Sequence, residues 1–398
     1  MNHLLSDRLN SLSPSETLAM SQKSNELKAQ GIDIINMSVG EPDFNTPEEI
    51  KNAAEKAIEA NFSYYTPVSG YLSLRQAIAD KLEKENGLKY TPNQVTCGNG
   101  AKQCVCNAIL TLVNPGDEVI IPAPYWVSYP QMVKLASGEP IIVSAGIEQD
   151  FKITPEQLEK AITPKTKALI LCSPSNPTGS VYTKEELLGL AEVLRKHPNV
   201  IIISDEIYEH INYSGKHESI ASCPDMFDRT LVINGVSKAY AMTGWRLGFA
   251  AGPDWLISAC NKLQGQYTSG PSSISQKAAE EAYKGSQKPV EEMREAFARR
   301  RDLIVKLAKE IPGFEVSVPQ GAFYLFPKCS YYFGKSANGE VIETATDLAF
   351  YLLNNAHVAC VGGDAFGSPE CIRMSYATSD DNIEEAMKRI KNALALLK

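Results

Sequence analysis

The sequence predicts an α/β fold, and two observations lead to this prediction. Short apolar runs rich in β-branched residues alternate with amphipathic segments, and helix-start signals stand between the runs. A strand, helix, strand order of this kind implies right-handed crossovers and a mostly parallel sheet. The expected strands are residues 95–97, 118–121, 140–143, 168–172, 200–204 and 230–234.

Helix starts are predicted from threonines that stand three residues before Glu or Gln. Thr46, Thr154 and Thr183 each have this spacing, which is typical of a capping box. A proline follows Thr46 and Thr154 at the first helical position, where a missing N–H costs nothing. Before them, residues 15–30 are polar with some apolar residues at helical spacing, which predicts a marginal helix.

After about Trp255 the pattern changes to long helices and shorter strands. Residues 288–309 and 382–397 are amphipathic and predict helices, and residues 330–340 are predicted to be a surface loop. This order indicates a smaller α+β domain after the large one. We expect a large domain over residues 47–285 and a small domain made of 1–46 and 286–398. The expected strands of the small domain are 314–318, 322–326, 358–361 and 371–375.

Composition excludes several classes of function. The chain has 398 residues and a formal net charge of -8, which argues against nonspecific binding to nucleic acid. Its nine cysteines form no C-x-x-C, and its five histidines form no H-E-x-x-H, so we expect neither disulfides nor a metal site. No run approaches the roughly 18 apolar residues of a membrane span, and the first residues do not resemble a secretory signal. These observations favour a cytoplasmic protein.

The most informative segment is residues 235–248. Lys238 follows an apolar strand, Ser237 beside it is small, and Arg246 stands eight residues further on, where it can reach an anion. A desolvated lysine near positive charge has a lowered pKa and can act as a nucleophile. The alternative for a bare lysine is a surface position at a strand end. The complete pattern resembles the Schiff-base signature of class I and II aminotransferases, which are fold-type I enzymes that depend on pyridoxal 5'-phosphate (PLP).

This resemblance covers almost the whole chain and implies both fold and chemistry. It implies a large domain with a mostly parallel, seven-stranded type of sheet between helices, and a smaller α+β domain. It also implies transfer of amino groups between amino acids and 2-oxo acids in two half-reactions. Lys238 would hold the cofactor and, once released, move a proton between the substrate α-carbon and the cofactor.

Two further segments follow apolar runs and carry polar side chains. Asp205 ends one run, at the carboxyl end of a parallel strand, where α/β proteins bind ligands. By the resemblance, Asp205 keeps the cofactor ring nitrogen protonated, and Tyr208 donates to the cofactor 3'-oxygen. Without the resemblance, Asp205 is better explained as the cap of a following helix. Asn176 precedes Pro177, which pushes it away from helical geometry, and the family uses this Asn to bind the 3'-oxygen and the substrate carboxylate.

The segment Gly100, Ala101 and Lys102 opens a predicted helix. It starts like a dinucleotide fingerprint, but Gln103 stands where the third glycine is needed. Backbone N–H groups at a helix start still bind anions. The resemblance assigns these three residues, with Ser237 and Arg246, to the cofactor and its phosphate. Many relatives carry Ser and Thr here, so backbone donors must contribute more in this chain.

Four more residues match the family at their positions. Trp126 matches the aromatic that stacks on the cofactor ring. Tyr65 matches a tyrosine that reaches the cofactor phosphate of a neighbouring subunit, which implies a homodimer. Gly40 matches a glycine whose backbone approaches the substrate carboxylate. Arg373 matches the arginine that binds this carboxylate through two parallel hydrogen bonds.

The substrate is predicted less directly. Residues 100–103, 123–129 and 241–246 are similar to the bacterial-type (subgroup Ib) aspartate aminotransferase branch, in which a lysine at the position of Lys102 binds the distal carboxylate. Alternatives are an aromatic or prephenate aminotransferase and a PLP-dependent lyase or synthase. Ser13 stands where some branch members carry a basic residue, which weakens the prephenate alternative. A further alternative is a non-catalytic regulator built on this fold. Such a protein would carry a DNA-binding extension, which we do not expect here, and would often lack the lysine, which is present as Lys238.

Overall fold

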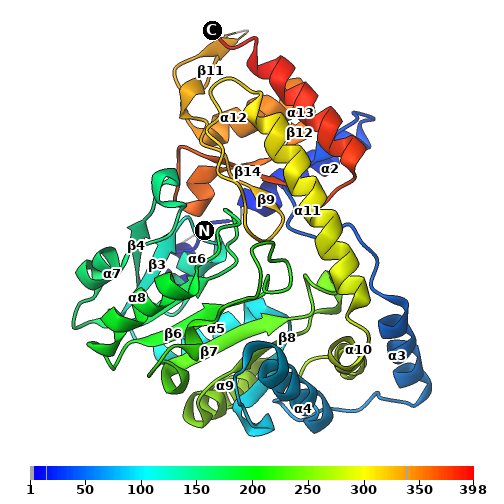
Figure 1. Ribbon diagram of the computed structural model, residues 1–398, viewed down its shortest axis with the longest axis vertical. Helices are drawn as coiled ribbons and strands as arrows, with labels where there is room; N and C mark the ends of the chain where they lie inside the picture. Colours follow the sequence, from blue (N-terminus) through cyan, green and yellow to red (C-terminus); the bar gives the residue numbers. More distant parts are fainter. Residues whose placement is uncertain (1–3, 15, 338) are drawn as a thin grey trace.

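The computed structural model describes residues 4–14, 16–337 and 339–398. Its centre is a seven-stranded sheet in which every strand but β8 runs in the same direction, so the α/β prediction is confirmed (Figure 1). A sheet of this type leaves the carboxyl ends of neighbouring strands at one edge. The spatial order is β2 (Val95–Gly98), β8 (Gly248–Ala251), β7 (Thr230–Gly235), β6 (Ile201–Asp205), β5 (Thr166–Cys172), β3 (Glu118–Ala123) and β4 (Glu139–Ser144).

Both faces of this sheet are covered by helices. In β5, Ala168 and Ile170 pack on one face, while Leu169 and Leu171 pack on the other. Because successive side chains of a strand point to opposite faces, a strand covered on both sides is apolar at every position. One face carries α5 (Ala101–Leu112), α6 (Ser128–Leu135) and α9 (Asp254–Tyr267), and the other carries α7 (Pro155–Ala161) and α8 (Lys184–Arg195).

A third group of helices packs beside β2 and β8 at the edge of the sheet. These helices are α3 (Glu48–Glu59), α4 (Leu72–Lys81), its continuation η2 (Leu82–Asn86) and α10 (Ser273–Lys284). Short helical turns connect other elements: η3 (Pro92–Gln94), η4 (Ile147–Gln149), η5 (Ile220–Ser222), η6 (Phe227–Arg229), η7 (Thr243–Trp245), η8 (Ser330–Tyr332), η9 (Leu352–Ala356) and η10 (Gly363–Phe366).

Both ends of the chain share a second core. Met20 and Ile34 pack with residues of the last hundred positions, and Figure 1 shows α2 in blue close to the yellow and red elements. We propose on this basis the domain division at residues 47 and 285. The elements are α2 (Glu16–Ala29), β1 (Ile35–Asn36), α11 (Lys288–Lys309), β9 (Tyr324–Leu325), β10 (Ser336–Ala337), β11 (Glu340–Val341), α12 (Ala345–Tyr351), β12 (Val358–Ala359), β13 (Val361–Gly362), β14 (Ile372–Ser375) and α13 (Asp380–Leu394).

Two of the three predicted capping boxes are confirmed. Thr154 and Thr183 each accept from a backbone N–H of the first turn, and Gln157 or Glu186 returns the bond. The prediction for Thr46 was wrong, since α3 has no side-chain cap. The Thr46 hydroxyl donates instead to the carbonyl oxygen of Ala241 at 2.7 Å, so a tertiary contact uses it.

The strand predictions differ from the structure at several places: β1 was not predicted, the predicted strand 358–361 is the two strands β12 and β13, and three further differences follow. Strand β8 was not predicted, because its four residues are mostly Gly and Ala and carry no β-branched signal. Residues 314–318 form no strand, and only Glu315 pairs there, as an isolated bridge with Lys328. The predicted loop 330–340 contains η8, the strand β10 and the first residue of its antiparallel partner β11, and residue 338 within it lies outside the described residues.

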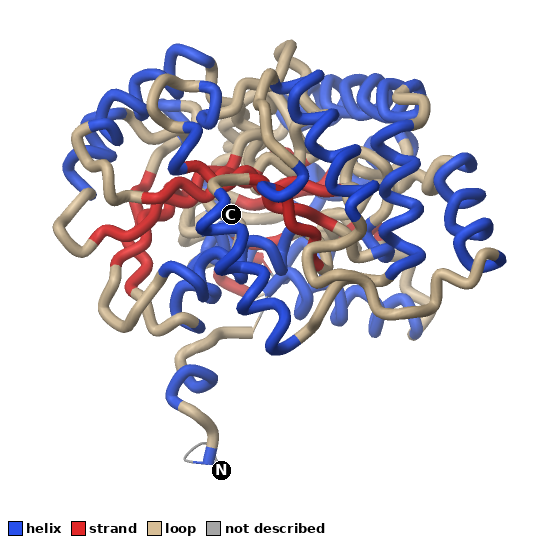
Figure 2. Tube along the Cα trace, turned by 90° about the horizontal axis from the view of Figure 1, so that it is seen from below, coloured by secondary structure: helices blue, strands red, loops and turns tan. Residues whose placement is uncertain are grey.

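The chain before α2 extends away from the rest of the molecule (Figure 2). Its short helix α1 (Asp7–Asn10) has no buried residue, and Leu4 is 77% exposed. A hydrogen bond of 3.0 Å from the Ser13 N–H to the side-chain oxygen of Gln131 ties this segment to α6. Among the described residues, no helix combines the length and the apolar character that crossing a membrane requires.

Candidate active site

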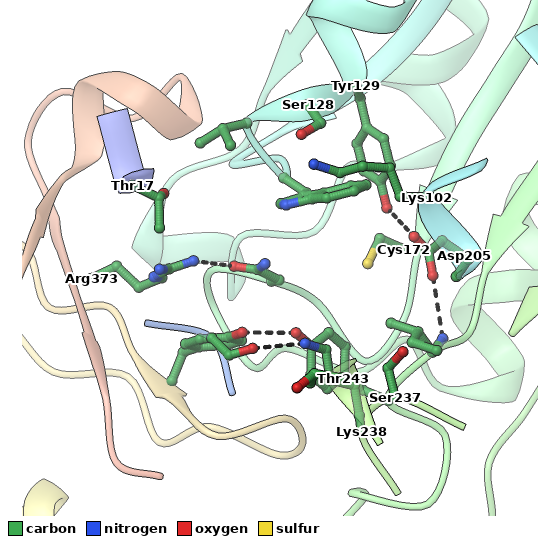
Figure 3. A pocket seen from close by; sticks show the side chains of 18 of the residues that line it. Thr17, Lys102, Ser128, Tyr129, Cys172, Asp205, Ser237, Lys238, Thr243 and Arg373 are labelled. Carbon is green, nitrogen blue, oxygen red and sulfur yellow. Dashed lines mark hydrogen bonds between the residues drawn. The ribbon is translucent and has the colours of Figure 1, made fainter. Parts of the chain in front are cut away.

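A cavity of about 330 Å3 lies where the carboxyl end of the sheet meets the second core (Figure 3). Asp205 is the last residue of β6, and Lys238 comes three residues after β7. Gly40 and Arg373 reach the cavity from the second core. The predicted site residues that line it are Gly40, Ala101, Lys102, Trp126, Asn176, Asp205, Tyr208, Ser237, Lys238, Arg246 and Arg373.

Lys238 points into the cavity from the loop after β7. Its ammonium donates to the carbonyl oxygen of Gly40 at 2.7 Å, which joins the two halves of the site. Burial lowers the pKa of Lys238 to about 8, and the positive charges of Arg373 and Arg246 act in the same direction. A lysine with such a pKa has a substantial neutral fraction near pH 8 and can act as a nucleophile or a base.

Asp205 is a buried carboxylate beside neutral donors. The Tyr129 hydroxyl donates to Oδ2 at 2.7 Å, and the Ile207 N–H donates to Oδ1 at 3.2 Å. Burial raises the pKa of Asp205 to about 6, although these two hydrogen bonds favour the ionised form. A carboxylate in this setting is suited to a cationic ligand group that would compensate its charge.

Arg373 offers a guanidinium edge to a ligand. Nη1 donates to the Asn176 side-chain oxygen at 2.9 Å, and Nη2 donates to the Ser38 carbonyl oxygen at 2.6 Å. The rings of Tyr324 and Phe366 lie 4.6 Å and 4.8 Å from its guanidinium carbon. Its Nε is buried and has no partner among the described residues. A planar guanidinium fixed in this way suits a carboxylate.

The start of α5 and Arg246 form a corner with positive potential. Gly100 has φ +81°, and a Cβ there would collide with the Arg246 guanidinium, so glycine permits this close approach. Arg246 donates to the carbonyl oxygens of Thr243 at 2.8 Å and Asn99 at 3.1 Å. Because α5 begins at Ala101, its first N–H groups have no intrahelical partner and can bind an anion.

Lys102 and Trp126 lie together on one wall of the cavity. The Lys102 ammonium is 4.9 Å from the centre of the Trp126 ring. Burial lowers the pKa of Lys102, and the charge of Arg246 lowers it further. Trp126 stands edge-to-face against Tyr129, with the ring centres 5.3 Å apart. The tryptophan face and a lysine charge are therefore available to a flat anionic ligand.

Comparisons with known proteins agree with this arrangement. The family described as aminotransferase class I and II matches residues 32–390. The chain belongs to this family. The predicted family and fold type are thereby confirmed, and enzymes of the family use PLP.

Individual relatives of this aminotransferase match it from end to end. An aspartate/prephenate aminotransferase of Cereibacter sphaeroides is 53% identical over 97% of this chain and 98% of its own length. A bifunctional aspartate aminotransferase and glutamate/aspartate-prephenate aminotransferase of Petunia hybrida is 51% identical over 99% of this chain and 83% of its own length. The crystal structure of the Rhizobium meliloti aspartate aminotransferase has a TM-score of 0.96 at 44% identity and covers 99% of both chains. The Thermus thermophilus enzyme, solved with maleate, has a TM-score of 0.92 at 41% identity and covers 98% of this chain and 99% of that one.

Among the lining residues that were not predicted from the sequence of this aminotransferase, three lie beside its polar groups. Tyr129 contacts Asp205, the Tyr324 hydroxyl lies 2.7 Å from the Tyr208 hydroxyl, and the Cys172 thiol lines the cavity between them. Tyr129 follows Trp126 by three residues, and its N–H donates to the Trp126 carbonyl oxygen at 3.0 Å where α6 begins, so this spacing was the available signal. Cys172 ends the expected strand 168–172, which was the available signal, whereas Tyr324 lies in the middle of the expected strand 322–326 and no signal marks it.

Gly100 and Tyr65 are the predicted site residues of this aminotransferase that do not line the cavity, although Gly100 lies against the Arg246 guanidinium at its edge. Tyr65 is 99% exposed and lies beside residues 270–273, in a separate shallow groove. Within a single chain it therefore contacts none of the other predicted site residues. Its predicted role requires a second subunit.

Proposed function

We propose that this aminotransferase moves the α-amino group of aspartate or glutamate to a 2-oxo acid, with PLP held on Lys238. The observation that carries the proposal is the convergence of Lys238, Asp205, Asn176 and Arg373 on one cavity. Relatives about half identical to this chain are named aspartate and aspartate/prephenate aminotransferases, which supports the choice of substrate.

The residues of the cavity fit PLP. Among the described residues, no opposite charge lies within hydrogen-bond distance of Asp205, which would pair with a protonated ring nitrogen, while Tyr208 would donate to the 3'-oxygen. The Trp126 face would stack on the ring. The start of α5, through the backbone at Gly100, Ala101 and Lys102, would bind the phosphate together with Ser237 and Arg246. When bound, PLP supplies an electron sink for the charge that develops at the substrate α-carbon.

The remaining chemistry is done by side chains of this chain. Arg373 and Asn176 bind the α-carboxylate, and the backbone at Gly40 closes that end of the site. Lys238 Nζ, when neutral, takes the α-proton of the amino acid and later returns a proton, as a general base and then a general acid. The same groups operate in reverse on the 2-oxo acid, which makes the two half-reactions a ping-pong cycle.

Lys102 is proposed as the group that selects a second carboxylate. Its ammonium lies over Trp126 in the same cavity that Arg373 lines, so the two cations can bind the two ends of a dicarboxylate. A solved relative is bound to maleate, a four-carbon dicarboxylate, which supports this assignment. Both curated relatives described above are also named for prephenate, and a prephenate activity of this chain is the second candidate.

We also propose a homodimer in which Tyr65 completes the site of the neighbouring subunit. The exposed face around Tyr65 includes Tyr64, which is 82% exposed, and the N-terminal segment exposes Leu4 and Leu9. Apolar and aromatic side chains at such exposure favour an interface between copies. A cytoplasmic location is proposed from the composition alone.

The test of the substrate assignment is a spectral titration of the purified protein with aspartate, glutamate, tyrosine and alanine. We expect a cofactor absorbance band that is absent in Lys238→Ala and that changes at the lowest concentrations of aspartate and glutamate. In Lys102→Ala, the KM for aspartate should rise about 10- to 100-fold, because a charged contact contributes roughly 1.5–3 kcal/mol, while the KM for alanine stays constant. Lys306→Ala, an exposed lysine of α11, is the control. An unchanged aspartate KM in Lys102→Ala would contradict the assignment.

A further inference from the structure

Tyr324 contacts three groups of the candidate active site. It is buried, and its hydroxyl lies 2.7 Å from the Tyr208 hydroxyl. The centre of its ring lies 4.6 Å from the Arg373 guanidinium carbon. A Cβ at Gly40 would collide with the Tyr324 hydroxyl oxygen, so glycine at position 40 leaves the space that this phenol occupies. The function proposed above gives Tyr324 no role.

The register of strands β9 and β14 brings Tyr324 to Arg373. The two strands are antiparallel, and Tyr324 lies opposite Ser375, two residues after Arg373. Residues i and i+2 of a strand point to the same face, and diagonal neighbours across a strand pair lie within reach of aromatic and long side chains. The Tyr324 ring can therefore lie against the guanidinium, where the attraction between a cation and an aromatic face helps to fix the arginine.

The two phenols stand on chain segments that backbone hydrogen bonds join. The Ala322 N–H donates to the Ile211 carbonyl oxygen at 2.8 Å, and the Tyr213 N–H donates to the Gln320 carbonyl oxygen at 2.8 Å. The segments before Tyr324 and after Tyr208 therefore keep a fixed distance from each other. Side chains that are already ordered in this way lose little conformational entropy when their hydroxyls form a hydrogen bond.

The direction of this hydrogen bond follows from the number of protons. Burial raises the pKa of Tyr208 and of Tyr324, so both phenols keep their protons near neutral pH. Among the described residues, the Tyr324 hydroxyl is the one hydrogen-bond partner of the Tyr208 hydroxyl. A hydroxyl has a single proton, so Tyr208 can donate to the cofactor 3'-oxygen only when it does not donate to Tyr324. With the opposite direction, Tyr208 would offer that oxygen only lone pairs.

We propose that Tyr324 is a positioning residue that donates to Tyr208 and thereby directs the Tyr208 proton to the cofactor 3'-oxygen. This inference rests on the proposed function, because it requires PLP on Lys238. A hydroxyl that accepts one hydrogen bond becomes a stronger donor in the next, so the two phenols in series stabilise negative charge on the 3'-oxygen better than Tyr208 alone. The ring of Tyr324 has a separate task, which is to hold the guanidinium of Arg373.

The test is a pH titration of the cofactor absorbance in the purified holoenzyme without substrate. Tyr324→Phe deletes the hydroxyl and keeps the ring. Because a weaker donor disfavours negative charge on the 3'-oxygen, we expect the midpoint of the titration to rise by about 0.5–1 pH unit. Tyr351→Phe is the matched control and should keep the midpoint of the parent, since the buried Tyr351 hydroxyl donates to the Ala393 carbonyl oxygen at 2.9 Å, outside the cavity.

Variants at Tyr208 decide whether Tyr324 acts through it. Tyr208→Phe should raise the midpoint more than Tyr324→Phe does. The double variant should have the midpoint of Tyr208→Phe, because without the Tyr208 hydroxyl the Tyr324 proton has no route to the cofactor. An unchanged midpoint in Tyr324→Phe overturns the proposal, and so do shifts that add in the double variant.

Binding of maleate to the holoenzyme measures the task of the ring. Maleate is the dicarboxylate bound in a solved relative. Tyr324→Phe should bind it within about twofold of the parent, whereas Tyr324→Leu, which lacks the aromatic face beside Arg373, should bind it about fivefold more weakly. Equal affinity of the two variants overturns the assignment of the ring.

Circular dichroism decides whether each variant is folded. If Tyr324→Phe does not fold, Gly40→Ala replaces it, because the added Cβ displaces the Tyr324 hydroxyl and should also raise the midpoint. A midpoint equal to that of the parent would again overturn the proposal. A parent without a cofactor band that depends on Lys238 contradicts the proposed function and this inference together, whereas such a band with an unchanged midpoint in the variants contradicts this inference alone.

Discussion

Asp205 and Glu209 lie four residues apart, are 4% and 6% exposed, and have pKa values that move in opposite directions. Burial raises the pKa of Asp205 to about 6, and its neighbours are a phenol and a backbone amide. Burial also acts to raise the pKa of Glu209, but the Lys81 ammonium and two imidazoles lower it far below the usual range. The pKa values of the two carboxylates differ because Glu209 has a compensating cation beside it, and not because one side chain is more deeply buried than the other.

This difference separates a carboxylate prepared for a ligand from one that holds the fold together. Asp205 destabilises the free protein while it is ionised, and a cationic ring nitrogen would relieve that cost. Glu209 already has its cation within the chain, so its charge contributes to the native structure. Removal of the Asp205 charge should therefore lower activity and raise the free energy of unfolding. Removal of the Glu209 charge should lower the free energy of unfolding.

The largest expected effect is the loss of amino transfer in Asp205→Asn. Because the amide cannot compensate a positive ring nitrogen, we expect kcat for aspartate to fall about 1000-fold, in the range found for lost electrostatic stabilisation. Single-turnover absorbance measurements check this. Asp228→Asn, outside the cavity, is the control. A variant Asp205→Asn within tenfold of the parent would show that the ring nitrogen needs no anion.

Glu209→Gln should instead reduce stability. It leaves the Lys81 ammonium buried with a neutral amide, and breaking a buried ion pair from one side typically costs about 3–5 kcal/mol. The free energy of unfolding from urea titration measures the loss. Glu192→Gln, an exposed carboxylate of α8, is the control. If Glu209→Gln has the same free energy of unfolding as the parent, compensation by Lys81 does not explain the difference between Asp205 and Glu209.

The pH dependence of stability should follow from Asp205. Its pKa is about 6 in the native apoprotein, against roughly 3.9 in an unfolded chain. Between these values the native state keeps a proton that the unfolded state has lost, so the free energy of unfolding falls as pH rises from 4 to 6. Asp205→Asn has no carboxyl group to titrate at this position. Its free energy of unfolding should exceed that of the parent apoprotein by up to about 3 kcal/mol at pH 7 and by little at pH 4. Urea titrations at both pH values check this, and a constant difference would contradict the assigned pKa.

The sequence predicts the fold well where local signals and tertiary contacts agree. The buried parallel strands and the caps at Thr154 and Thr183 are examples, since their patterns are local. The capping-box prediction at Thr46 is wrong because its hydroxyl donates to the carbonyl oxygen of Ala241, almost two hundred residues away. Strand β8 was not predicted because its small residues show no strand propensity.

The candidate site divides in the same way. Lys238 and Asp205 are recognisable because short motifs surround them. The Tyr129 contact with Asp205, and the approach of His210 and His217 to Glu209, depend on how separate segments pack. Spacing along the chain carries no information on such contacts, and only the folded arrangement reveals which carboxylate has a cation.

Removal of the hydroxyl that donates to Asp205 is the smallest and most specific change. Tyr129→Phe deletes one hydrogen bond to the ionised carboxylate, a contribution of about 1–3 kcal/mol for a charged acceptor. The pKa of Asp205 should therefore move above its present value of about 6, and amino transfer at pH 7 should fall several-fold while it recovers at pH 9. Carbon NMR of labelled aspartate in the apoprotein measures the pKa, and Tyr125→Phe is the control. An unchanged pKa would mean that burial alone sets the ionisation of Asp205, and the phenol would then have only a packing role beside Trp126.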